Sequence, residues 1–115
     1  MKLSIFYKPR KVHIMSHPKS FNLYSDPGHA WLRVPLSEIQ RFNLLSKISN
    51  YSYINNNYLY LEEDVDAPLY LNLLKENGYN PFNEYGCIKE IISNNPSQIR
   101  NYKHFSIVDF LQGVK

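Results

Sequence analysis

Residues 50–68 read NYSYINNNYLYLEEDVDAP, and this stretch decides the fold. Tyrosines alternate with smaller side chains on both sides of an asparagine run, which predicts two antiparallel strands joined by a tight turn. The second strand leads directly into four carboxylates and then into Pro68, a residue that suits the first turn of a helix. The stretch therefore predicts a strand–turn–strand–helix unit.

The length of the turn decides which side chains share a face of this hairpin. A two-residue turn at Asn55-Asn56 places its four tyrosines on one face and its leucines on the other. A three-residue turn would place the first strand's tyrosines beside the second strand's leucines. We expect the two-residue turn, which would build a tyrosine ladder that binds a partner if it is exposed. The alternative is a ladder covered by a terminal segment. The expected pairs are Tyr53 with Tyr58 and Tyr51 with Tyr60.

The whole chain predicts one α+β domain over residues 1–115. We expect a small, mostly antiparallel sheet of four or five strands with two main helices packed on one face. Ser37 and Gln40 form a capping box for the first helix, which would run to about residue 47. Asp66 is the expected N-cap of the second helix, residues 67–76, with Gly78 beyond its end. The other expected elements are strands at 3–7, 11–15, 29–34 and 87–92, a loop at 16–28, a helical turn at 96–102 and a helix at 106–111.

Composition restricts the class of protein. The 115 residues are 43% apolar and 20% charged, which is ordinary for a globular domain and unlike a disordered chain. The net charge of +3 is well below that of a dedicated nucleic-acid binder. The single cysteine, Cys87, excludes an intrachain disulfide and is expected to be a buried small side chain. No leader or membrane-spanning run is present, so we expect a soluble cytoplasmic protein without membrane association.

The acidic run and one histidine are the candidate reactive groups. Glu62, Glu63 and Asp64 could bind a cation or act as a general base, and His29 stands at the mouth of a strand after a tight turn. The plainer interpretation is that the acids belong to a strand-to-helix junction and that His29 ties its loop to a carboxylate or carbonyl. Nucleophile and phosphate-loop motifs are absent, and we expect no metal or cofactor.

Two stretches combine basic and aromatic residues and could bind single-stranded nucleic acid. One is Lys8-Pro9-Arg10-Lys11 with Phe6 and Tyr7 before it, and the other is residues 97–104. Such stretches can contact phosphates and stack on bases. The alternative is a pair of solvated basic loops, which the low net charge favours.

Three segments, SDPGHAWL (25–32), ISNYSY (48–53) and YLEEDVDA (60–67), resemble a group of short uncharacterised proteins of bacteriophages, plasmids and other mobile elements. The resemblance covers about residues 20–78. Because these motifs have no assigned chemistry, it implies no catalytic residue. It implies a bacterial or phage cytoplasmic setting and an accessory role, such as inhibition of a host defence system.

The function we expect is a non-enzymatic interaction protein that binds and modulates a protein partner, such as a host nuclease or defence complex. The aromatic excess and the absence of a recognisable active site favour it over the alternatives. The first alternative is a small hydrolase or nuclease, with or without a divalent metal, that uses His29 with Glu62, Glu63 or Asp64. The second is single-stranded nucleic-acid binding. The expected partner contacts are Tyr51, Tyr53, Tyr58, Tyr60, Glu62, Glu63 and Asp64.

Overall fold

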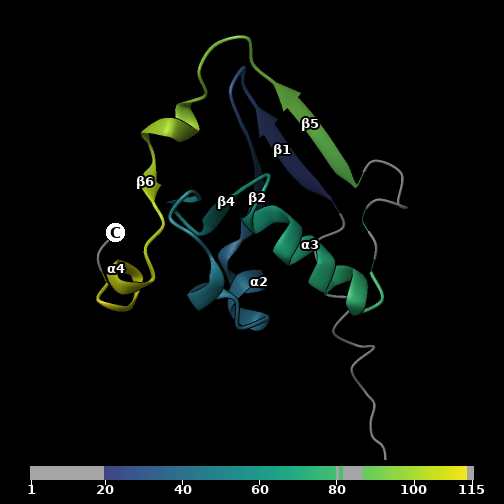
Figure 1. Cartoon of the computed structure of the whole chain (residues 1–115), viewed down its shortest axis with the longest axis vertical. Coiled ribbons are helices and arrows are strands. Elements are labelled where there is room, and N and C mark those ends of the chain that lie inside the picture. The colour runs from purple at the N-terminus through teal and green to yellow at the C-terminus, as the bar shows by residue number, and fades with distance from the viewer. Residues whose placement is uncertain (1–19, 80, 82–86, 114–115) are drawn as a thin grey trace, which may run out of the picture.

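The computed structural model describes residues 20–79, 81 and 87–113. The strands expected at 3–7 and 11–15 and the basic stretch at 8–11 lie outside these residues. Within the described part, six strands form one mixed sheet with the order β5-β1-β2-β4-β3-β6 (Figure 1). The strands are β1 (Phe21–Ser25), β2 (Ala30–Pro35), β3 (Tyr53–Asn55), β4 (Tyr58–Glu62), β5 (Ile88–Ile92) and β6 (Lys103–His104). The helices are α2 (Leu36–Arg41), α3 (Asp66–Glu76) and α4 (Ile107–Leu111), with 3-10 turns η1 (Leu45–Lys47) and η3 (Gln98–Asn101).

The α+β class is confirmed and the sheet is mostly antiparallel as expected, but it has six strands instead of four or five. β1 pairs with β5 in parallel, whereas the other neighbouring strands are antiparallel. The loop expected at 16–28 is wrong for residues 21–25, which form β1. This strand was missed because loop-forming residues surround it and its partner β5 lies far along the chain. None of the helices in the described residues is both long and apolar enough to cross a bilayer.

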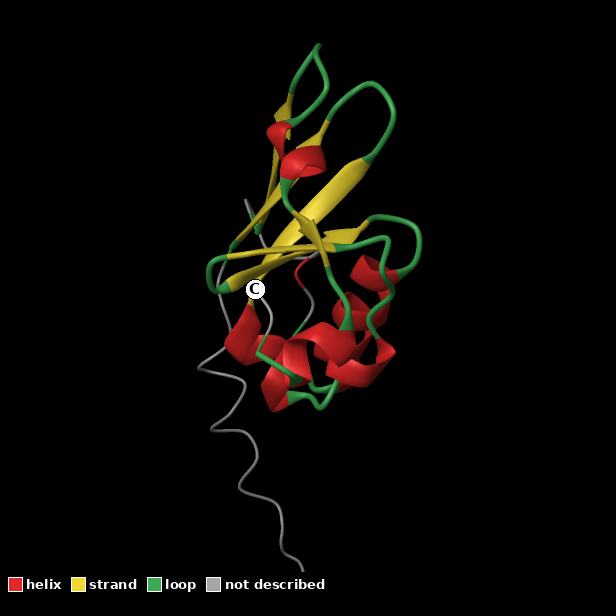
Figure 2. Ribbon diagram, turned by 90° about the vertical axis from the view of Figure 1, so that its left-hand side faces the viewer, coloured by secondary structure: helices red, strands yellow, loops and turns green. Residues whose placement is uncertain are grey.

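The sheet buries a different kind of side chain on each face. One face is aliphatic and packs against α2 and α3, and Figure 2 shows the larger helices gathered on one side of the strands. Its most buried members are Leu32, Val34, Leu59 and Leu61, each at most 1% exposed. The opposite face carries a second, aromatic cluster built from Trp31, Tyr53, Tyr60 and Ile99. Strand alternation produces this division, since neighbouring residues of β2 and β4 point to opposite faces.

The first helix is shorter than expected and begins differently. α2 ends at Arg41, and Asn43 adopts a left-handed backbone (φ 56°), so the expected helix to residue 47 is divided between α2 and η1. The Ser37 capping box is wrong, because α2 already starts at Leu36 and no side chain caps it. The buried Glu38 carboxylate instead accepts a hydrogen bond from the Tyr70 hydroxyl at 2.6 Å.

Asp66 is not the N-cap of the second helix. It is the first residue of α3, and no side chain caps that helix. Its fully buried carboxylate instead accepts hydrogen bonds from the Ser49 backbone N–H (3.1 Å), the Ser49 hydroxyl (2.6 Å) and the Ser52 hydroxyl (2.5 Å). Because the Ser52 oxygen in turn accepts from the Glu62 N–H at 2.9 Å, this network fixes the loop before β3 against the end of β4.

The hairpin has the expected two-residue turn, but one position later than predicted. Asn55 pairs with Tyr58 and Tyr53 pairs with Tyr60, so the turn residues are Asn56 and Asn57. Asn56 supplies the left-handed conformation (φ 57°) that a hairpin turn of this length needs. The expected pairs of Tyr53 with Tyr58 and of Tyr51 with Tyr60 are therefore wrong, since the partner of Tyr53 lies two residues farther along β4.

The exposed tyrosine ladder is also wrong. Tyr53 and Tyr60 are only 9% and 7% exposed, because the C-terminal segment covers them, which was the alternative considered. Tyr51 and Tyr58 are exposed. The aromatic face is therefore an internal layer with exposed margins.

The Asp66 network predicts a large stability effect. Asp66→Ala should lower the free energy of unfolding by about 3 kcal/mol, since it leaves buried donors without a charged acceptor. Urea denaturation measures this. The control is Asn72→Ala on the exposed side of α3, which should shift stability by no more than about 0.5 kcal/mol. Equal effects of the two substitutions would contradict the assigned role of Asp66.

Candidate functional site

A cleft of about 280 Å³ lies where the aromatic face meets the carboxyl end of β4. We call it the aromatic cleft. It combines aromatic rings with charged groups from four parts of the chain that are distant in sequence. Its lining residues are His29, Trp31, Tyr51, Tyr53, Glu62, Asp64, Val65, Arg100 and His104.

The cleft brings together several of the residues expected from the sequence. His29, Glu62 and Asp64 all line it, so the histidine and two of the carboxylates lie on the same side of the molecule. Glu63 is exposed and does not line the cleft; its backbone N–H donates to the Ala30 carbonyl at 3.1 Å. These three residues therefore share the cleft lining, and their roles stay a prediction.

Asp26 fixes the turn between β1 and β2 and also holds a distant segment. Its Oδ1 atom accepts hydrogen bonds from the backbone N–H groups of Gly28 and His29, both at 3.0 Å. Its Oδ2 atom accepts from the Ser97 N–H at 2.8 Å and from the Arg100 Nε at 2.7 Å. The Arg100 Nη2 also reaches Oδ1 at 2.9 Å, which completes a two-pronged guanidinium–carboxylate pair. We call this arrangement the Asp26 clamp.

The clamp keeps Asp26 ionised. The Arg100 guanidinium, followed by the Ser97 N–H, holds the pKa of the Asp26 carboxyl well below its ordinary range. Desolvation acts in the opposite direction, since the side chain has no exposed surface, but the hydrogen bonds outweigh it. The same pair raises the pKa of Arg100. The negative charge of Asp26 is thus permanent at ordinary pH and compensates Arg100.

Gly28 makes room for the clamp. A Cβ atom at this position would lie 2.9 Å from the Arg100 Nη2, closer than such contacts allow. Arg100 also lies over the ring of Trp31, with its guanidinium carbon 5.2 Å from the ring centroid. The turn, the arginine and the single tryptophan of the chain therefore form one packed unit.

Residues 97–105 form a strap across the aromatic face, and we call them the C-terminal strap. Ile99 is 2% exposed, and Tyr102 packs on Tyr60 with ring centroids 5.1 Å apart. Burial, followed by the nearby Tyr102, raises the pKa of Tyr60. The far end of the strap is attached to the sheet, since β6 pairs with β3 and the Phe105 N–H donates to the Ser52 carbonyl at 2.8 Å.

His104, which the strap carries into the cleft, has a defined orientation. Its Nδ1 lies 2.7 Å from the Asn50 carbonyl oxygen. Because a carbonyl only accepts, Nδ1 is the donor in this contact. The imidazole also packs on Tyr53 with ring centroids 4.4 Å apart. The His29 ring lies beside Trp31 at 6.0 Å, but it is the backbone of His29, and not the expected ring, that ties the turn to a carboxylate.

Glu62 and Asp64 differ in the hydrogen bonds that their carboxylates accept. The Oε1 atom of Glu62 accepts from the N–H groups of Asp64 (3.0 Å) and Val65 (2.9 Å) and so shapes the junction that leads into α3. Within the described residues, the Oε2 atom of Glu62 and the carboxylate of Asp64 accept no hydrogen bond. The cleft therefore offers carboxylate oxygens to a ligand.

The sequence interpretation missed Trp31, Arg100 and His104. Arg100 and His104 were considered as part of a basic stretch, but their positions depend on contacts with Asp26 and Asn50 that lie 74 and 54 residues away. No local pattern encodes such contacts. The one available indication was the tight turn after Asp26, whose carboxylate has more acceptor capacity than a turn needs.

Neither protein-family models, curated proteins nor solved structures match this chain. The candidate site therefore depends on its own geometry. Among residues 20–79, 81 and 87–113, no three histidine, cysteine or acidic side chains are grouped so that they could hold a metal ion.

The clamp predicts how the strap responds to substitution. Asp26→Asn should weaken the hold on Arg100 and Ser97 and expose Trp31, so acrylamide should quench tryptophan fluorescence more efficiently than in wild type. Asp109→Asn, which breaks the half-exposed Lys103–Asp109 pair instead, is the control and should leave quenching unchanged. Unchanged quenching in Asp26→Asn would contradict the clamp.

The clamp also predicts a pH dependence. The pKa of Asp26 is lowered on folding, so its contribution to stability is complete above the ordinary carboxyl pKa of about 4 and declines as the pH falls below it. The difference in unfolding free energy between wild type and Asp26→Asn should therefore be constant from neutral pH down to about 4 and then shrink. Urea denaturation at a series of pH values measures it, and a difference that grows on acidification would contradict the assignment.

Proposed function

We propose that this protein is a small non-enzymatic interaction protein whose aromatic cleft receives a basic side chain of a protein partner. The observation that carries this proposal is the pairing of free carboxylate oxygens on Glu62 and Asp64 with aromatic walls in one cleft. Carboxylates form charge-assisted hydrogen bonds with guanidinium and ammonium groups, and aromatic faces attract the same cations.

The charge balance supports a cationic ligand. In the part of the chain that the structure describes, Arg100 is the one arginine or lysine of the cleft lining, and its charge is already compensated by Asp26. Glu62 and Asp64 have no comparable cationic partner among the described residues. The cleft is therefore net acidic, although the whole chain carries a charge of +3.

The size of the cleft supports a single side chain. At about 280 Å³ it is slightly smaller than the usual small-molecule site, about 300–1,000 Å³. An arginine or lysine side chain extending from a partner surface is a ligand of suitable size. The exposed Tyr51 and Val65 at the margin, 64% and 50% exposed, would then contact the surface around that side chain.

The other predicted contacts have different parts in this proposal. Tyr53 and Tyr60 are buried and act by shaping the aromatic layer, whereas Tyr58 is exposed farther along the same face, under the Arg33 guanidinium at 4.6 Å. Glu63 is exposed beside the cleft and stays a predicted rim contact. Tyr58 and Glu63 would extend the interface beyond the central side chain.

The class of partner follows from the acidic cleft and the resemblance together. Nucleases and other nucleic-acid enzymes expose arginines and lysines that contact phosphates. An acidic cleft that captures such a residue would compete with the nucleic acid. We therefore propose a host nuclease or defence complex as the partner, with the protein acting as an inhibitor in the cytoplasm of a bacterial host cell.

One observation favours a second candidate, a His/carboxylate hydrolase. His29 and His104 share the cleft with Glu62 and Asp64, and His104 is oriented by a backbone carbonyl as a general base would be. In such an enzyme the Nε2 of His104 would take a proton from an attacking water. The nucleic-acid alternative has less support, because Arg100 of the 97–104 stretch is committed to Asp26 and Trp31.

Fluorescence of the single tryptophan tests the proposal directly, since Trp31 lines the cleft. N-acetyl-arginine methylamide should change the emission of Trp31 saturably, with a dissociation constant on the order of 1 mM for so small a probe. The neutral analogue N-acetyl-glutamine methylamide should have no effect. The isosteric double substitution Glu62→Gln with Asp64→Asn should abolish the response, whereas the control Glu76→Gln, on α3, should preserve it.

Two results would contradict the proposal. One is an unchanged emission throughout the arginine titration of wild type, and the other is an equal response in the double variant. The hydrolase alternative predicts something different: a Trp31 response to a substrate that is turned over by wild type but not by His104→Gln.

A further inference from the structure

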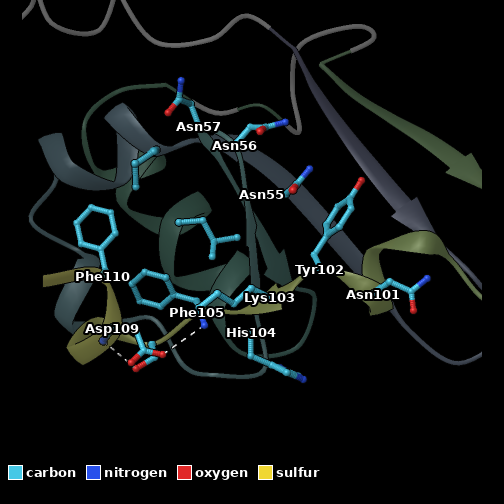
Figure 3. Close-up of a pocket in the computed structure, with 13 residues that line it drawn as sticks. Asn55, Asn56, Asn57, Asn101, Tyr102, Lys103, His104, Phe105, Asp109 and Phe110 are labelled. Atoms are coloured by element: carbon cyan, nitrogen blue, oxygen red, sulfur yellow. Dashed lines mark hydrogen bonds and ion pairs between the residues drawn. The ribbon is translucent and has the colours of Figure 1, made fainter. Parts of the chain in front are cut away.

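A second, larger cavity lies on the far side of the C-terminal strap. It has a volume of about 760 Å³ and lies between the β3–β4 turn, the strap and α4 (Figure 3). We call it the asparagine groove, because four of its lining residues are Asn55, Asn56, Asn57 and Asn101. Apart from His104, its lining residues differ from those of the aromatic cleft.

The fold does not explain why these residues are asparagines. Only Asn56 has the left-handed backbone for which asparagine is favoured in a turn. Asn55 belongs to β3, where asparagine is a poor choice, and Asn57 has no such backbone requirement. Within the described residues, none of the four carboxamides makes a side-chain hydrogen bond. The groove therefore presents several unused groups that each carry both donors and an acceptor.

The fixed charges of the groove cancel. Lys103 and Asp109 both line it, and their Nζ and Oδ2 atoms lie 3.6 Å apart. Among the described residues, no other lysine, arginine or acid lines the groove. This balance disfavours phosphates, carboxylates and basic side chains as ligands and favours an uncharged one.

The other side of the groove carries phenylalanines beside the Lys103–Asp109 pair, and Phe110 is the more exposed of them, since Phe105 is only 1% exposed. Figure 3 shows Asn55, Asn56 and Asn57 on one side and Phe105 and Phe110 on the opposite side. A matching ligand would carry polar groups that both donate and accept along one edge and hydrocarbon along another. Pyranose sugars have this character, because their hydroxyls both donate and accept and their ring C–H groups form apolar patches.

We propose that the asparagine groove is a binding site for a neutral saccharide. Its volume lies within the usual range for ligand sites, about 300–1,000 Å³, and leaves room for a short oligosaccharide. Hydroxyls would pair with the carboxamides of Asn55, Asn57 and Asn101, and ring C–H groups would pack on Phe110. This site is independent of the basic-side-chain cleft, so either proposal can fail without the other.

NMR on the ¹⁵N-labelled full chain tests the proposal. Maltotriose, cellotriose and chitotriose are titrated separately, and at least one should shift the side-chain NH₂ signals of Asn55, Asn57 and Asn101 saturably. Asn57→Ala and Asn101→Ala should each weaken that binding about threefold to tenfold, the effect of losing one neutral hydrogen bond. The control Asn72→Ala, on the exposed side of α3, should leave the affinity unchanged.

Other outcomes would overturn the proposal. One is the absence of shifts at these asparagines with all three sugars. Another is a response to triglycine amide or to a thymidine oligonucleotide that exceeds the response to every sugar, because the site would then recognise peptide or nucleic acid. Shifts from a sugar that both asparagine variants retain in full would place that sugar elsewhere on the protein.

Discussion

The contact on which the candidate site depends is the pair between Asp26 and Arg100. One carboxylate, shielded from solvent, accepts hydrogen bonds from the β1–β2 turn and from the C-terminal strap at the same time. Gly28 has no side chain that would clash with Arg100, and the guanidinium of Arg100 packs over the ring of Trp31. Four residues thus join two segments that are about 70 positions apart in the sequence.

This contact converts a flat aromatic sheet face into a cleft. A strap that lay elsewhere would leave Tyr53 and Tyr60 exposed, as the sequence alone suggested. With the strap in place these rings become an internal layer, His104 reaches the cleft and pairs its strand with β3, and Arg100 is neutralised. Among the described residues, the acids at the end of β4 are then left without a cationic partner of their own. The same strap forms one wall of the asparagine groove on its other side.

Local sequence patterns predicted the elements whose stabilising contacts are local. These include α3, with Gly78 beyond its end, the terminal helix predicted at 106–111, and the two-residue length of the hairpin turn. Local sequence patterns gave wrong predictions where a side chain binds a partner far away in the sequence. Asp66 resembles an N-cap but binds serines 14 and 17 residues away, and Asp26 binds Arg100. Part of the cleft could be predicted, since Glu62, Asp64 and His29 lie in local patterns that mark them as candidate site residues. Arg100 and His104 could not be predicted, because tertiary contacts place them in the cleft.

Amide hydrogen exchange of the wild-type protein tests the central claim most directly. The Ser97 N–H donates to Asp26 and the Phe105 N–H to Ser52, so both ends of the strap should exchange slowly, at rates comparable with those of the strand amides of β2 and β4. That result would establish the strap as a stable part of the fold. Exchange of Ser97 and Phe105 at the rates of an unstructured peptide, while β2 and β4 stay protected, would contradict the clamp and the cleft that depends on it.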